Sequence, residues 1–276
     1  MNSYRLLLSV ICASVLLASC SNYTKVLKSK DIDYKLAMAD KYFSQKKYRI
    51  AQELYEELYP VYKGTEKFEE IYYKDAYCFY HMKDYRNAEN FFKGFLEVFP
   101  NSTRAEEVDF MHAYCFYLQS PKIELDQTYT SKSIGVMQTF INTHPGSDRI
   151  KDANVIIDKC REKLEVKDYR AAELYFKIGQ YRAAALAFEA LLNSYPESAM
   201  ADVYKYKIVK SYYRYAKLSV LDKQVERYER VVDECNDFID RFPESKHLSD
   251  AQSYKNLSLN SIKEIKNEQI KTSAKR

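Results

Sequence analysis

The chain has 276 residues, of which only 5 are Gly and 6 are Pro, so helix-breaking residues are scarce. An all-β sandwich needs a turn every ~8–12 residues, and this composition excludes one. Hydrophobic residues make up 46% and charged residues 30%, which excludes both a disordered chain and a protein with several membrane spans. The net charge of +4 comes from interleaved basic and acidic residues, a pattern that favours a solvated helical surface over a nucleic-acid-binding face.

The N-terminal residues have the pattern of a bacterial secretion signal, in which a basic residue precedes a short apolar run. Arg5 precedes the run Leu6–Leu17, whose 12 residues are too few to cross a bilayer, because a spanning helix needs ~20. Residues 17–20 read Leu-Ala-Ser-Cys and resemble the lipobox of bacterial lipoproteins. The resemblance implies a signal peptide over residues 1–19 and acyl chains on Cys20. The alternative is a plain secretory signal followed by an incidental Cys.

The same resemblance predicts where the mature protein is located. Residues 20–31 would form a lipidated tether. Residue 21 is Ser rather than Asp, and no acidic run follows. In lipoproteins this implies the outer membrane, with the chain facing the periplasm.

Four cysteines remain once Cys12 is removed with the signal and Cys20 is acylated. They form no CxxC pair and have no His at metal-ligand spacing, so we expect no metal site. An oxidising compartment permits a disulfide, and whether any two of them pair stays open. Each lies in an apolar-rich stretch, which favours four small buried fillers. They are Cys78, Cys115, Cys160 and Cys235.

A four-residue phrase with Pro second and Ser fourth recurs along the chain, at residues 99–102, 144–147, 195–198 and 242–245. Pro ends one helix and Ser caps the next, so the phrase marks junctions between helices. A second phrase, Tyr-Arg-x-Ala, precedes it in three units. The residues that repeat around that Ala are the Ala itself (Ala51, Ala88, Ala184), an aromatic four residues later (Tyr55, Phe92, Phe188), an Ala twelve residues earlier (Ala39, Ala76, Ala172), and an aromatic three after that (Tyr42, Phe79, Tyr175).

This spacing resembles the tetratricopeptide repeat (TPR), a helix–turn–helix unit of ~34 residues. Ala at the crossing lets two helices approach closely, and the rings fill the space on either side. One pair cannot bury its apolar face alone, so the pairs stack. The sequence therefore predicts an all-α fold, an α-solenoid of about five TPR-like helix pairs.

Helix-breaking residues divide the predicted solenoid into two groups of repeats. Repeats 1–3 are predicted over residues 32–147, with an insertion in the third around Ser120. After Gly146 the chain has no Pro or Gly until Gly179, which predicts one long helix over residues 148–177. That helix and repeats 4 and 5 occupy residues 148–264. The fifth repeat is expected to carry extra length between its two helices, and residues 265–276 to form a flexible basic tail.

Nothing in the chain has the pattern of a catalytic site, because the four His are scattered and no nucleophile or phosphate-binding motif occurs. We expect a protein that is not an enzyme and has no cofactor. The predicted first helices of repeats 2 and 3 instead carry an aromatic stripe, one residue off the core positions. Such rings suit an extended apolar or aromatic peptide, and packing between repeats is the alternative. The stripe is Tyr73, Tyr77, Tyr80, Phe110, Tyr114 and Tyr117. Arg104 and Lys74 are candidates to meet a peptide carboxylate.

Nearly the whole mature chain resembles the BamD family, the TPR lipoproteins of the outer-membrane β-barrel assembly (BAM) complex. The densest match runs from Lys163 through the Ala172 phrase to residues 191–196, Leu-Leu-Asn-Ser-Tyr-Pro. The resemblance implies a non-enzymatic scaffold. Its N-terminal repeats would receive the C-terminal aromatic signal of unfolded barrel proteins, and its C-terminal repeats would dock on the barrel subunit BamA.

Two other classes of protein are alternatives to the BamD family. One is a periplasmic TPR adaptor of the Tol–Pal or cell-wall systems, but those have an N-terminal coiled coil and no heptads precede residue 33. The other is a glycan-binding helical lipoprotein of the SusD kind. Such proteins stack sugars on Trp, which this chain lacks.

Overall fold

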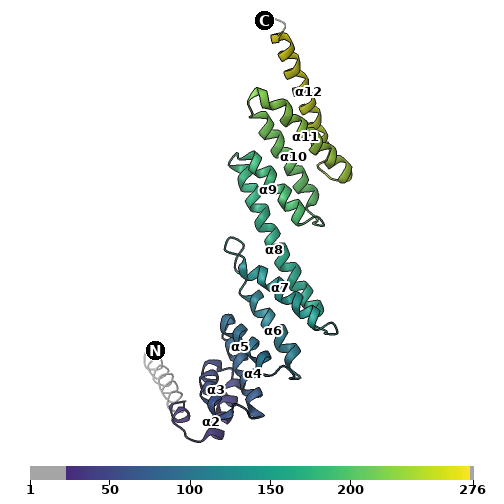
Figure 1. The fold of residues 1–276 in the computed structure, drawn as a ribbon. Coiled ribbons are helices and arrows are strands. Elements are labelled where there is room, and N and C mark those ends of the chain that lie inside the picture. The colour runs from purple at the N-terminus through teal and green to yellow at the C-terminus, as the bar shows by residue number, and fades with distance from the viewer. Residues whose placement is uncertain (1–22, 274–276) are drawn as a thin grey trace, which may run out of the picture. The chain divides into compact units, whose positions relative to one another are not determined.

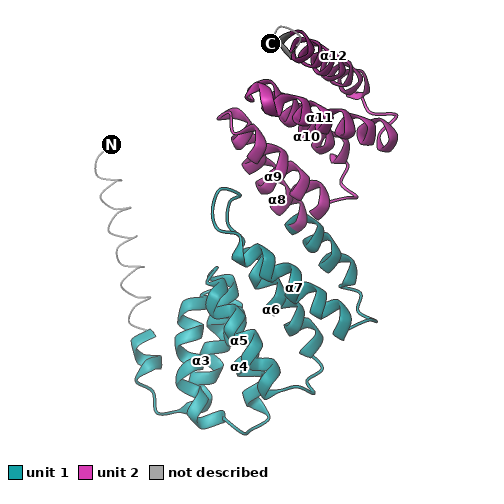
Figure 2. Ribbon diagram, turned by 45° about the horizontal axis from the view of Figure 1, so that its top comes forward, with its two compact units in different colours: residues 1–160 teal, residues 161–276 magenta. Residues whose placement is uncertain are grey.

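The computed structural model describes residues 23–273, and every regular element in this range is an α-helix (Figure 1). The predicted all-α solenoid of TPR-like helix pairs is confirmed. The predicted signal peptide and Cys20 lie outside the described residues. The chain divides into two compact units, residues 1–160 and residues 161–276 (Figure 2). This division falls inside the long helix, whereas the sequence placed the change of repeats at the start of that helix.

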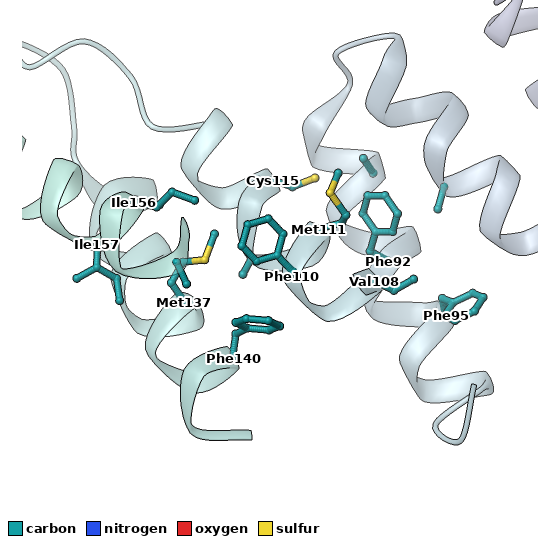
Figure 3. Packing of buried hydrophobic residues seen from close by; sticks show 14 of the residues in the cluster. Phe92, Phe95, Val108, Phe110, Met111, Cys115, Met137, Phe140, Ile156 and Ile157 are labelled. Carbon is teal, nitrogen blue, oxygen red and sulfur yellow. The ribbon is translucent and has the colours of Figure 1, made fainter. Parts of the chain in front are cut away.

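Unit 1 contains three helix pairs, and each helix packs against the next along the chain. The pairs are α2 (Ile32–Ser44) with α3 (Tyr48–Tyr62), α4 (Lys67–His81) with α5 (Tyr85–Val98), and α6 (Ala105–Leu118) with α7 (Thr128–Thr143). The insertion expected in the third repeat is the loop between α6 and α7. The first part of α8 (Ile150–Lys177) completes the core of this unit through Ile156 and Ile157, which face Met137 (Figure 3).

In unit 2 the remainder of α8 is followed by α9 (Tyr181–Ser194), α10 (Ala201–Lys217), α11 (Leu221–Arg241) and α12 (Leu248–Ser273). The extra length of the fifth repeat was predicted between its helices, and this is wrong. Its helices are themselves long, 17 and 21 residues, because no Gly or Pro between Pro196 and Pro243 stops them. Where a flexible tail was predicted from residue 265, α12 continues as a helix to Ser273.

The Ala positions of the repeat lie in the cores where the paired helices cross. All six are fully buried, with 0% of the residue surface exposed: Ala39, Ala51, Ala76, Ala88, Ala172 and Ala184. Because a larger side chain has no room at such a crossing, the sequence fixes the register of each pair there. The four remaining cysteines are also buried, as expected for small fillers.

The rings around these Ala positions divide into two groups. Those four residues after the second Ala are all fully buried: Tyr55, Phe92 and Phe188. Those three residues after the first Ala differ, since Tyr42 is buried, Phe79 is half-buried against Phe91, and Tyr175 is 44% exposed. The prediction of a core ring at Tyr175 is therefore wrong. In α8 the next residue, Phe176, makes the contact instead, with its ring 5.2 Å from that of Tyr181.

Each Pro-x-Ser phrase builds the same junction. The Ser hydroxyl oxygen accepts the backbone N–H two residues later, at 3.0–3.1 Å, in Ser102, Ser147, Ser198 and Ser245. The predicted Ser cap is therefore wrong in position: the Ser fixes the turn before the helix, and the N-cap residues of α6 and α10 are Arg104 and Met200, without a side-chain cap bond. Each hydroxyl also donates to a carboxylate on the first helix of the repeat that ends there: Glu69, Glu106, Glu165 and Asp202. This second bond ties the start of each new repeat to the preceding one.

The segment before α2 is packed against unit 1. Val26 is 1% exposed and belongs to the core around α2 and α3. The Lys35 ammonium donates to the Leu27 carbonyl at 3.1 Å and to Glu57 at 2.6 Å, and Tyr23 donates to Glu53. From Tyr23 onward, the predicted tether is therefore part of the folded unit.

Candidate functional site

The structure brings the six residues of the aromatic stripe together on two neighbouring first helices, α4 and α6. Phe110 is buried, and the five tyrosines are half-buried. Successive ring centroids lie 4.8 and 6.1 Å apart on α4 and 6.0 and 5.7 Å apart on α6. All six rings contact the same core cluster, part of which Figure 3 shows around Phe110 and Phe92.

Two hydroxyl groups of the stripe are already engaged inside the protein. Tyr73 and Tyr77 both donate to Oε1 of Glu107, at 3.0 and 2.5 Å, and so join α4 to the first turn of α6. Burial, and after it the hydrogen bond to Glu107, raises the pKa of Tyr77 well above its usual value. Tyr77 is therefore a neutral donor at physiological pH, and its ring face is what it offers to a ligand.

Part of the stripe has a structural role that recurs in unit 2. The residue two positions after a junction Ser covers an aromatic ring on the preceding first helix. Arg104 lies over Tyr73 at 4.4 Å, and Arg149 lies over Phe110 at 5.1 Å. In unit 2 the His247 ring stacks on Tyr206, with centroids 4.2 Å apart. Because both units have this pairing, it accounts for Tyr73 and Phe110 without a ligand.

Two other stripe residues are specific to unit 1. Tyr77 and Tyr114 lie four residues after Tyr73 and Phe110 on their helices. Four residues after the corresponding rings of unit 2, Tyr169 and Tyr206, the chain has Glu173 and Lys210. The repeat architecture does not require a Tyr there, so Tyr77 and Tyr114 are the strongest ligand candidates in the stripe.

The two cations suggested for a peptide carboxylate are paired with the protein's own acids. Arg104 bonds Glu70 at 2.5 Å, and Lys74 contacts Glu70 at 3.1 Å and Asp40 at 2.9 Å. These pairs lower the pKa of Glu70 despite its partial burial. A peptide carboxylate would have to displace these partners.

Sequence reasoning missed a second aromatic surface in unit 1, an open cleft where α3, α4 and α5 meet. Its volume is about 950 Å³, and we call it the aromatic cleft. It is lined by Tyr59, Pro60, Lys63, Gly64, Thr65, Phe68, Tyr72, Val98 and Phe99. The available signal was the first junction, which departs from the Pro-x-Ser phrase: Pro60 lies inside α3, and Gly64 turns the chain with a φ of 86°.

Tyr72 is the central ring of the aromatic cleft. It stacks on Tyr59 with centroids 5.5 Å apart and meets Phe68 edge-on at 5.8 Å. Gly94, in the middle of α5, leaves the space that its hydroxyl occupies, since a Cβ at this position would collide with the Tyr72 Oη. A Gly inside a helix costs about 1 kcal/mol relative to Ala, so the chain gives up helix stability to seat this ring.

A carboxyl group lies buried behind the aromatic cleft. Asp75 on α4 is 0% exposed, and its Oδ2 accepts the Tyr59 hydroxyl at 2.7 Å. Its Oδ1 has no hydrogen-bond partner. Burial raises the pKa of Asp75 to about 7, and the Glu56 charge contributes in the same direction. Asp75 thus fixes the orientation of a cleft ring at a cost in solvation.

Unit 2 has a hollow of different chemistry. Its volume is about 610 Å³, and it lies between α9, α10 and α11. The charged groups that line it are Arg182, Lys223, Glu226, Arg227, Glu229, Arg230 and Asp233. Tyr212 lies among them and donates to Glu189 at 3.0 Å. A hollow with both signs of charge suits a polar protein surface better than an apolar peptide.

Residues 23–273 have two further properties, which concern membrane spans and metal ions. No helix in this range has both the length and the apolar character to cross a bilayer. Nor do its His, Cys, Asp and Glu side chains gather, three or more together, where a metal ion could be held.

The comparisons with known proteins begin with solved structures. The TPR2AB domain of yeast Sti1, in complex with pHSP90, is 14% identical with a TM-score of 0.38, covering 83% of this chain and 97% of that one. A TPR protein of Bacteroides fragilis NCTC 9343 is 11% identical with a TM-score of 0.39, covering 85% of this chain and 100% of that one. We draw no argument from likenesses this distant.

A comparison with curated proteins finds no match. The family models give the assignment. The model of the outer membrane lipoproteins called YfiO, which is the BamD family, matches residues 34–203. The match covers more than half of the chain, including all of unit 1's helix pairs and the repeat formed by α8 and α9. The chain therefore belongs to the YfiO family of outer membrane lipoproteins.

Proposed function

We propose that the protein is a non-enzymatic scaffold of the outer-membrane β-barrel assembly machinery. It is anchored by acyl chains on Cys20, faces the periplasm, receives unfolded barrel proteins in unit 1 and docks on a BamA-like subunit through its C-terminal repeats. The family assignment supports the location in the outer membrane. The aromatic cleft is the observation that best supports the receiving role.

The chemistry of the aromatic cleft matches a chain that ends in an aromatic residue. Its walls are rings and aliphatic groups, which remove an aromatic side chain from water. Lys63 lines the same cleft and supplies a positive charge for a terminal carboxylate. The aromatic stripe on α4 and α6 would contact residues further along the same extended peptide.

Truncating a ring of the stripe tests whether it binds peptide. Tyr77→Ala and Tyr114→Ala should each weaken binding of a C-terminal barrel-protein peptide by ~1–3 kcal/mol, as for other interface hot spots. Fluorescence anisotropy gives the affinity, and thermal unfolding gives the stability of each variant. Loss of stability with unchanged affinity would show that these rings only pack between repeats.

A cleft variant tests the aromatic cleft separately from the stripe. Lys63→Glu with Val98→Asp changes the charge and polarity of the aromatic cleft at two exposed residues, so the fold should be preserved. The proposed function requires this variant to bind the peptide less tightly. If it binds as the wild type does while the stripe variants fail, the stripe alone is the receiving surface. If all three variants bind normally, unit 1 does not receive clients in this way.

The docking role is supported by the charged hollow of unit 2. Its charged side chains lie on α9 and α11 and present both signs of charge over a small area. Such surfaces set orientation and partner choice in protein complexes. Arg182→Glu should weaken co-purification of the BamA-like subunit while leaving peptide binding by unit 1 unchanged, and the opposite pattern would contradict the assignment.

Removing the lipidation site tests the anchor. Cys20→Ala should pass into the soluble periplasmic fraction once salt has weakened ionic contacts, because the acyl chains on Cys20 are the proposed anchor. Fractionation followed by a high-salt wash measures this. A variant that stays with the membrane after the wash would show that the attachment does not depend on Cys20.

A further inference from the structure

Unit 2 exposes aliphatic side chains at the turns between paired helices. In the turn from α10 to α11, Leu218, Val220 and Leu221 are 73%, 71% and 63% exposed. At the turn from α8 to α9, Leu174 and Ile178 are 58% and 59% exposed. Loops of soluble surfaces are usually polar, and a run of open aliphatic groups is a feature that needs a partner.

The two turns lie on one edge of unit 2. Figures 1 and 2 show both on the same side of the unit. The charged hollow lies along the same edge, since Arg182 and Leu186 near the start of α9 line it together with Lys223 near the start of α11. We call the five aliphatic residues of the two turns, with Leu186, the aliphatic edge.

Basic side chains flank the aliphatic edge. Lys177 and Arg182 border the first turn, and Lys217 and Lys223 border the second; all four are exposed. The exposed acids in the second turn region are Asp222 and Glu226, and Glu226 pairs with Lys223 at 3.2 Å. Four cations against two carboxylates leave a positive border around an apolar tip, and such a border attracts anionic groups.

The choice of side chains favours a lipid surface over a protein partner. Protein interfaces are enriched in Tyr, Phe, Met and Arg at their centres and depleted in Lys. This chain contains 27 Tyr and 14 Phe, yet its most exposed turn uses Leu and Val, bordered by Lys. Aliphatic tips that enter the acyl region, with Lys reaching phosphate groups at the headgroups, are typical of proteins that lie on a membrane.

We propose that the aliphatic edge of unit 2 is a second membrane contact, which binds the anionic phospholipid surface of the bilayer to which the protein is anchored. This inference rests on the outer-membrane location of the family but not on client binding or BamA docking. The aliphatic groups supply the apolar contact, and the lysines supply attraction to anionic headgroups. The contact would hold the C-terminal repeats at the membrane surface.

Vesicle co-sedimentation tests this proposal with the mature chain, residues 20–276, carrying Cys20→Ser, so that neither acyl chains nor the signal peptide contribute. The protein should bind vesicles of phosphatidylethanolamine and phosphatidylglycerol. It should bind phosphatidylcholine vesicles less, and added salt should weaken the binding. The triple variant Leu218→Ser, Val220→Ser, Leu221→Ser should bind the anionic vesicles about tenfold less tightly or worse. Because these side chains are exposed, its thermal unfolding should match that of the parent.

A control variant removes three exposed aliphatic groups from another element of the same unit. Leu257→Ser, Leu259→Ser, Ile270→Ser on α12 should bind the anionic vesicles as the parent does. Equal loss in the control and the turn variant would overturn the assignment to this edge. Failure of the parent to bind would overturn the membrane contact. A turn variant that loses the BamA-like subunit but binds vesicles normally would show that the edge docks protein rather than lipid.

Discussion

Asp75→Asn is expected to stabilise the protein at pH 8 by up to about 4 kcal/mol relative to the wild type, because each unit of pKa shift corresponds to ~1.4 kcal/mol. At pH 4 the same substitution should have little effect. Asp75 is fully buried, with one oxygen on the Tyr59 hydroxyl and the other without a partner. Ionising Asp75 at this site costs solvation free energy, and no cation is among the groups that shift its pKa.

The sign follows from proton binding. Burial raises the pKa of Asp75 from 3.8 to about 7 in the folded chain. Between these two values the folded state holds a proton that the unfolded state has lost, so wild-type stability falls as pH rises through this window and is level above it. Asn carries no charge in either state, so the variant should lack this fall. Urea unfolding at several pH values between 4 and 8 measures both curves.

Two results would contradict this account. A variant whose stability follows the same pH dependence as the wild type would place the titration on another group. A variant that is less stable than the wild type at pH 8 and closer to it at pH 4 would mean that Asp75 is ionised and partnered in the folded state. Tyr59→Phe provides the related control: it removes the hydrogen bond to Asp75 but keeps the ring in the aromatic cleft, so it should raise the pKa of Asp75 further.

The parts of the fold that follow from local rules were readable in the sequence. Ala at a helix crossing and Ser after Pro are short-range requirements, so Ala184 and Ser198 could be placed without knowing their neighbours. The length of α8 followed from the absence of Pro and Gly between Gly146 and Gly179. In the fifth repeat the absence of Pro and Gly led to a wrong prediction of extra length between the helices. A missing breaker shows that helices continue, but it does not show where the chain turns.

Of the candidate site, the aromatic stripe could be predicted from the sequence and the aromatic cleft could not, for a related reason. The stripe lies on α4 and α6 at helical spacing, so periodicity alone brings Tyr77 near Tyr80 and Tyr114 near Tyr117. The aromatic cleft combines Tyr59 from one repeat with Tyr72 and Phe99 from the next. Its opening depends on Pro60 continuing within α3 and on the turn at Gly64, a junction that departs from the repeated phrase.

The rings of Tyr175 and Phe176, close to Ala172, show that a shift of one residue along a helix decides which ring is buried. The repeat pattern predicted a core ring three residues after Ala172, at Tyr175, as at Tyr42 in the first repeat. In α8 the contact passes to Phe176, four residues after that Ala, and leaves Tyr175 44% exposed. A difference of one residue turns a side chain by about 100° around a helix with 3.6 residues per turn, which is enough to exchange core and surface.

Two truncations in the fourth repeat therefore test whether Tyr175 lies in the core, as the repeat pattern predicts, or at the surface, as the structure has it. One of them should cause one of the largest losses of stability expected for this chain. Phe188 is fully buried in the core of unit 2, with its ring 5.9 Å from that of Tyr169. Phe188→Ala should lower the free energy of unfolding by about 3–5 kcal/mol, since it leaves a cavity that the packed helices fill only in part. Tyr175→Ala, at an exposed position, should change it by about 0.5 kcal/mol or less.

Urea unfolding of the full chain measures both variants, and hydrogen exchange locates the change. Loss of protection after Phe188→Ala should be concentrated in α9 and α10, whose residues form the same core cluster. Equal destabilisation by the two substitutions would mean that α8 is rotated from the orientation described, with Tyr175 in the core. That rotation would also carry Leu174 and Ile178 away from the surface, so the aliphatic edge proposed for membrane contact depends on the same result.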